Sequence, residues 1–64
     1  MIYKLYPNDS VKEKQPIRTW CENNFVDGTW SVTSNYEERD YDQCPFLFCT
    51  ENEQDAVLFA LRWS

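Results

Sequence analysis

The stretch Cys44-Pro45-Phe46-Leu47-Phe48-Cys49 carries the clearest structural signal in this 64-residue chain. On an extended strand its two phenylalanines fall on one face, while Leu47 and Cys49 fall on the other. A strand that is apolar on both faces is expected at the centre of a sheet. Pro45 lacks a backbone donor and therefore belongs at the start of this strand.

The residues that follow predict a helix over residues 52–62. Thr50-Glu51-Asn52-Glu53 matches the capping-box pattern, which marks helix starts. Apolar residues then recur at helical spacing: Ala56, Phe59, Ala60 and Trp63, with Val57, Leu58 and Leu61 widening the stripe. Acids at the start and Arg62 at the end agree with the helix macrodipole. Residues 58–63 also alternate, so a short closing strand there is an alternative.

Three earlier segments complete the pattern. Residues 2–6 alternate apolar and polar side chains before a turn-rich cluster, which predicts a strand. Pro16 suits the first position of a helix, and the spacing of the apolar residues after it predicts a helix over 16–24. Gly28 then tolerates positive φ in a turn, and residues 29–34 alternate as a half-buried strand does.

The predicted order is therefore β-α-β-β-α in one small domain, residues 1–64. If the first crossover is right-handed and the middle strands form a hairpin, the sheet order is 1-3-2, which puts the doubly apolar strand in the centre. We expect a two-layer α+β sandwich. It resembles a truncated ferredoxin-like unit with a three-stranded antiparallel-type sheet and both helices on one face.

The residue types exclude most catalytic chemistry. The chain has no histidine, so neither a Ser-His-Asp triad nor a Cys-His pair can form within it. Its single glycine rules out a phosphate-cradling loop. Cys21, Cys44 and Cys49 are an odd count without a C-x-x-C pair, which favours reduced thiols that act as small apolar side chains over disulfides or a zinc site. We expect a protein that is not an enzyme and has no cofactor or metal.

Charge is concentrated in one part of the sequence. The chain has eleven acidic and six basic residues, a net charge of −5, and residues 37–55 hold seven of those acids and one base. We therefore expect one acidic side on a nearly neutral scaffold, which disfavours direct binding of nucleic acid and favours a basic partner. The chain lacks the long apolar run of a signal peptide or membrane span, so we expect a cytoplasmic protein without membrane contact.

The polar residues 35–43, named here the acidic loop, are the candidate binding surface. Spaced carboxylates can imitate nucleic-acid phosphates, and tyrosines within a charged segment are typical of interface hot spots. The candidate residues are Tyr36, Glu37, Glu38, Asp40, Tyr41 and Asp42. The plainer interpretation is a solvated connection between two strands. A cation site made from these carboxylates is a further alternative, which a flexible loop would support poorly.

The C-terminal third resembles a known group of proteins. Phe46-Leu47-Phe48, followed by Glu53-Gln54-Asp55-Ala56 and a Phe59-Ala60-Leu61-Arg62-Trp63 close, is similar to the pattern that ends many small accessory proteins of large tailed bacteriophages. The pattern reflects a strand packing on a helix, so no functional residue is implied. The resemblance implies a phage protein that works in the host cytosol by binding a host protein.

These observations predict a small acidic protein that binds a host protein with a basic, nucleic-acid-handling surface, and inhibits or redirects it. The alternative is a structural or homodimeric module. Residues 29–34 carry no charge, and an uncharged edge strand can pair with a second copy unless another segment covers it.

Overall fold

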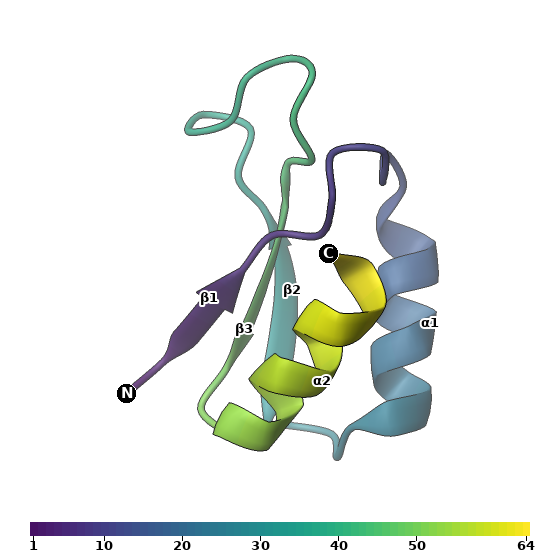
Figure 1. Cartoon of the computed structure of the whole chain (residues 1–64), viewed down its shortest axis with the longest axis vertical. Helices are drawn as coiled ribbons and strands as arrows, with labels where there is room; N and C mark the ends of the chain where they lie inside the picture. Colours follow the sequence, from purple (N-terminus) through teal and green to yellow (C-terminus); the bar gives the residue numbers. More distant parts are fainter.

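The structure is a computed structural model that describes residues 1–64 as a three-stranded sheet and two helices. The elements are β1 (Tyr3–Leu5), α1 (Lys14–Asn24), β2 (Trp30–Ser34), β3 (Phe46–Thr50) and α2 (Glu53–Trp63). β3 lies between β1 and β2 and is antiparallel to both (Figure 1). The predicted α+β fold, its element order and the central position of the doubly apolar strand are confirmed.

Both helices cover the same face of the sheet. The sheet contributes Val32, Phe46 and Phe48 to the buried cluster. These side chains share one face of the sheet, because Val32 of β2 pairs with Phe48 of β3 and Phe46 lies two residues before Phe48 on the same strand. The cluster also contains residues of α1 and of α2. α2 contacts β1 and β3, whereas α1 contacts β2. The opposite face of the sheet is left without a helix.

Stacked aromatic rings fill this small core. Phe48 of β3 and Phe59 of α2 lie parallel, with ring centroids 4.1 Å apart. Trp20 of α1 meets Phe25 and Trp63 edge-on, at 5.4 and 6.1 Å. Such pairs add about 0.5–1.5 kcal/mol each beyond the area they bury, which helps so short a chain to hold a fixed core.

The ends of the helices differ from the prediction. α1 begins at Lys14, two residues before Pro16, because proline is tolerated anywhere in a first turn where no N–H bond is required. α2 extends to Trp63, so the alternative of a closing strand at 58–63 is wrong. Asn52, rather than Thr50, caps α2, because its side chain accepts hydrogen bonds from the backbone N–H groups of Gln54 and Asp55.

Thr50 has a different function at this junction. Its side chain is buried, and its hydroxyl donates to the Thr29 carbonyl (2.9 Å) and accepts from the Asn52 N–H (3.2 Å). One hydroxyl therefore links the start of β2, the end of β3 and the cap of α2. Gly28 precedes this point with φ +88°, in the turn closed by the Thr29 N–H and the Val26 carbonyl.

One part of the predicted core is at the surface. Val57, Leu58 and Leu61 were expected to widen the buried stripe of α2, but they are 54%, 42% and 77% exposed. The buried side of α2 consists of Ala56, Phe59 and Trp63 alone. The helix lies on the outside of a two-layer fold, so only one of its sides meets the sheet.

Candidate functional site

The acidic loop folds into two consecutive turns. The Glu38 N–H donates to the Asn35 carbonyl (3.3 Å), and the Gln43 N–H donates to the Asp40 carbonyl (3.0 Å). Gln43 also accepts from the Asp40 N–H through its side-chain oxygen (2.9 Å). The loop extends beyond the ends of β2 and β3, at the top of Figure 1.

Arg39, the only base in the loop, is turned inward. Its Nε donates to the Cys44 carbonyl (3.0 Å), and its guanidinium lies 3.9 Å from the ring centroid of Tyr6. The same group pairs with Asp9 at 3.4 Å. The Arg39 side chain is only 19% exposed as a result. The positive charge is therefore held beneath the loop, and the outer surface keeps the carboxylates.

The connection between β1 and α1 supports the loop from below. The Asn35 side chain donates to the Tyr6 hydroxyl (2.8 Å), and Lys12 Nζ donates to the Asp42 carbonyl (3.0 Å). The Cys44 N–H donates to the Asp9 carboxylate (3.2 Å). Contacts between residues about 30 positions apart hold the loop in one conformation, so it is more than a loose linker. No local sequence pattern predicts these contacts.

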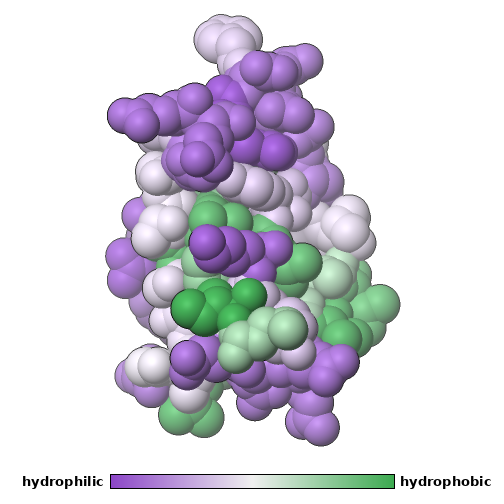
Figure 2. Space-filling view, turned by 90° about the vertical axis from the view of Figure 1, so that its left-hand side faces the viewer, coloured by the Kyte–Doolittle hydropathy of each residue, from purple (hydrophilic) through white to green (hydrophobic).

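The predicted binding residues lie together on this loop and face outward. Tyr36 is 67% exposed, with its ring edge-on to Phe46, and Tyr41 is fully exposed at 104%. The four carboxylates are exposed as well: Glu37, Glu38, Asp40 and Asp42. A depression of about 380 Å³ is lined by both tyrosines, by Lys12 and Arg39, and by neighbouring loop residues. The upper part of the molecule is accordingly strongly hydrophilic (Figure 2).

The prediction of one continuous acidic side is wrong. The acidic loop precedes β3, whereas Glu51, Glu53 and Asp55 follow β3 and surround the start of α2. A five-residue strand separates the two groups by roughly 15 Å, at about 3.3 Å per residue. The loop and the start of α2 lie at opposite ends of the molecule (Figure 1). The acids that are near one another in sequence therefore form two surfaces.

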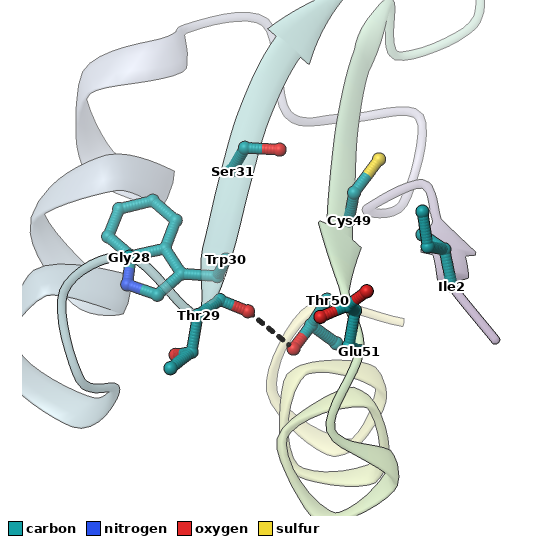
Figure 3. A pocket seen from close by; sticks show the side chains of 8 residues that line it. All are labelled: Ile2, Gly28, Thr29, Trp30, Ser31, Cys49, Thr50 and Glu51. Atoms are coloured by element: carbon teal, nitrogen blue, oxygen red, sulfur yellow. Dashed lines mark hydrogen bonds between the residues drawn. The ribbon is translucent and has the colours of Figure 1, made fainter.

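A second hollow lies at the lower end of the uncovered sheet face. Figure 3 shows Ser31 and Cys49 side by side on β2 and β3, with Ile2 beyond them and the Thr50–Thr29 hydrogen bond below. The hollow measures about 230 Å³ and is open to solvent. Its lining includes the Ser31 hydroxyl, the Cys49 thiol and the Glu51 carboxylate, and no hydrogen bond joins these three side chains.

The thiols behave as apolar side chains. Cys21 and Cys44 are fully buried and all three cysteines are free. Burial, with a smaller contribution from the neighbouring Glu22 carboxylate, raises the pKa of the Cys21 thiol to about 12. The neutral thiol is the stable form in the core. The chain gathers no group of three or more His, Cys, Asp or Glu side chains suited to a metal ion.

Comparison with protein-family models, with curated proteins and with solved structures finds no match for this chain. Neither helix is long and apolar enough to cross a membrane. The interpretation of the acidic loop therefore rests on its own geometry.

Proposed function

We propose that this chain is a non-enzymatic binding protein that recognises a basic protein surface through the acidic loop. The observation that carries the proposal is the inward position of Arg39. With the loop's own cation turned inward, the loop presents carboxylates and two tyrosines on a backbone that is already folded, and Lys12 of the preceding connection lies beside Asp42. A preformed loop loses little entropy on binding, and exposed tyrosines add large rigid contacts.

The partner that fits this surface carries a basic groove, such as one that normally holds nucleic acid. Carboxylates spaced along a loop can occupy the sites of phosphates, and opposite charge speeds the encounter of the two proteins. The net charge of −5 opposes binding to nucleic acid itself. The resemblance of the C-terminal third to phage accessory proteins supports a host protein as the partner, bound in the host cytosol and thereby inhibited or redirected.

Affinity purification from bacterial lysate tests this proposal. The wild-type chain is compared with a variant in which Glu37, Glu38, Asp40 and Asp42 are replaced by lysine. The matched control reverses four exposed acids outside the loop: Glu13, Glu22, Asp27 and Glu51. Both variants change the net charge equally. A host protein retained by wild type and by the control, but lost with the loop variant, supports the proposal.

Two results would contradict it. One is the absence of any specifically retained protein. The other is retention of the same proteins by the loop variant. Tyr41→Ala tests recognition by the tyrosine separately from charge, because it leaves the net charge unchanged and the Tyr41 side chain is 104% exposed. We expect it to weaken binding roughly tenfold without changing the melting temperature.

A second candidate function is homodimerisation through the edge of β2. The Asn35 N–H donates to the Pro45 carbonyl, so by the antiparallel pattern the backbone groups of Trp30, Val32 and Ser34 point away from β3. The acidic loop extends past the strand rather than alongside it (Figure 1). Ser34→Pro would remove one outward donor and should abolish a dimer of this kind, as measured by sedimentation.

A further inference from the structure

α2 is apolar on two opposite sides. One side, with Phe59 and Trp63, packs on the sheet. The other side carries Val57, Leu58 and Leu61, which are three to four residues apart or adjacent and therefore form one stripe along the helix. No segment of the chain covers this outer stripe. Its flanks are polar, with Glu53 and Gln54 near its start.

The charges around the outer stripe are arranged in a self-complementary way. Asp55 lies in the first turn of α2 and Arg62 in the last. They are seven residues apart and thus lie on the same flank of the helix. Neither forms an ion pair within the chain. The Arg62 guanidinium stacks over the Trp63 ring at 4.4 Å, next to the end of the stripe.

We propose that the outer stripe of α2 binds a second copy of this chain, with the two helices antiparallel across a two-fold axis. In that arrangement equivalent flanks meet, so Asp55 of each copy faces Arg62 of the other, and Leu61 packs near Val57 of the other copy. The helix dipoles are also opposed, which is favourable. In a parallel pair this flank would instead meet the opposite flank of the other helix, so Asp55 and Arg62 would not face each other.

The position of the acidic loop agrees with this arrangement. The Asn8 N–H bonds to the Trp63 carbonyl, and the connection that contains Asn8 supports the loop, so the loop lies toward the C-terminal end of α2. Antiparallel packing therefore places the two loops at opposite ends of the dimer, where their repulsion is weakest. The loops would stay free for a partner. The inference does not depend on the proposed function of the loop.

The size of the stripe sets the strength of the dimer. The exposed apolar area is on the order of 300 Å² per copy, which is within the range of functional patches on small proteins. Two copies would bury less than about 1,200 Å² in total, which is typical of weak association. We expect dissociated chains at ~10 µM and a substantial dimer population at ~1 mM.

Sedimentation velocity over this concentration range tests the proposal. We expect Leu61→Glu to weaken dimerisation at least roughly tenfold, because it places a carboxylate against Val57 of the other copy. Val26→Glu is the matched control: Val26 is 73% exposed, lies outside α2 and undergoes the same change of charge. A chain that stays monomeric at ~1 mM overturns the proposal. Equal dimerisation of the two variants overturns it as well.

A charge exchange tests the orientation. Asp55→Lys and Arg62→Glu should each weaken self-association, whereas an equimolar mixture should form mixed dimers in which every facing pair is attractive. A mixture that associates no better than its components contradicts the antiparallel arrangement. Circular dichroism confirms that each variant remains folded. A dimer that is lost with Ser34→Pro but kept with Leu61→Glu would assign the contact to the β2 edge and overturn the α2 proposal.

Discussion

Replacing Arg39 by alanine removes the residue that organises the acidic loop. The substitution deletes the hydrogen bond to the Cys44 carbonyl (3.0 Å), the stacking on Tyr6 (3.9 Å) and the ion pair with Asp9 (3.4 Å). It also leaves the Cys44 carbonyl without this donor beside a fully buried side chain. Both the stability of the fold and the conformation of the loop should respond.

The three contacts differ in their contribution to the free energy of unfolding. A hydrogen bond from a charged group contributes about 1.5–3 kcal/mol. Stacking of a largely buried guanidinium on tyrosine adds about 1 kcal/mol. The ion pair adds about 0.5 kcal/mol or less, because Asp9 is 60% exposed. We expect Arg39→Ala to cost about 3 kcal/mol, a large share of the stability of a domain of this size.

Urea unfolding followed by tryptophan fluorescence measures this loss, because Trp20 and Trp63 lie in the core packing. Arg18→Ala is the matched control. Arg18 contacts Glu22 at 4.0 Å, and both side chains are about half exposed, at 50% and 52%. Its loss should change stability by about 0.5 kcal/mol or less. Equal effects of the two substitutions would refute the assignment of Arg39 as the anchor of the loop.

The same variant separates charge from shape in the proposed binding function. Arg39→Ala makes the chain more acidic by one charge, so attraction to a basic partner alone would be strengthened. If recognition depends on the folded loop, the variant should bind more weakly despite its added negative charge. Arg39→Lys keeps the charge but loses the planar donor, and it should fall between alanine and wild type.

Three further substitutions or conditions probe the core and its turns. Thr50→Val should cost about 1–2 kcal/mol in urea unfolding because both hydrogen bonds of the buried hydroxyl are lost, whereas the exposed Thr33→Val should change stability by less than about 0.5 kcal/mol. Gly28→Ala should cost about 1 kcal/mol through backbone strain alone, because φ is +88° and no atom lies within 4 Å of an added Cβ; Gly28→Asn should cost less. Folding raises the pKa of Cys21 from 9.0 to about 12, so the contribution of its neutral thiol to the free energy of unfolding is complete below pH 9 and is lost as the pH rises toward 12. Between pH 8 and pH 10, the free energy of unfolding should therefore fall by about 1.4 kcal/mol more for wild type than for Cys21→Ala. Equal pH profiles of the two proteins would contradict this.

The sequence predicted the sheet well because its strongest pattern lies in the central strand. Phe46 and Phe48 lie on one face of this strand, and Leu47 and Cys49 lie on the other. Only the middle position of a three-stranded sheet gives such a strand a neighbour along both edges. Once β3 is central, the chain order leaves β1 and β2 as edges. Pro45 marks the start of the strand because the ladder ends there with a single bond from the Asn35 N–H.

The surfaces were harder to predict. Spacing shows that Val57 and Leu61 share a side of a helix, but it cannot show which of two apolar sides meets the sheet. Burial of Ala56, Phe59 and Trp63 decides this in the folded chain. Charge near Glu38 and Glu53 appeared as one cluster because sequence distance ignores the strand between them. The inward position of Arg39 depends on Tyr6 and Asp9, about 30 residues earlier, and no local pattern reports such contacts.

The two proposed contacts respond differently to salt, which allows each to fail independently. Attraction between exposed carboxylates of the loop and a basic partner is screened, because the Debye length falls to ~3 Å at 1 M salt. Burial of Leu61 and its neighbours is not screened, and salt also reduces the repulsion between two copies that each carry a net charge of −5. If a dimer persists in ~1 M salt while a retained host protein is released, the host contact belongs to the acidic loop and the dimer does not; Leu61→Glu and Ser34→Pro then decide between the outer stripe and the β2 edge. Loss of both together would mean that one charged surface serves both, because only ionic contacts share that dependence.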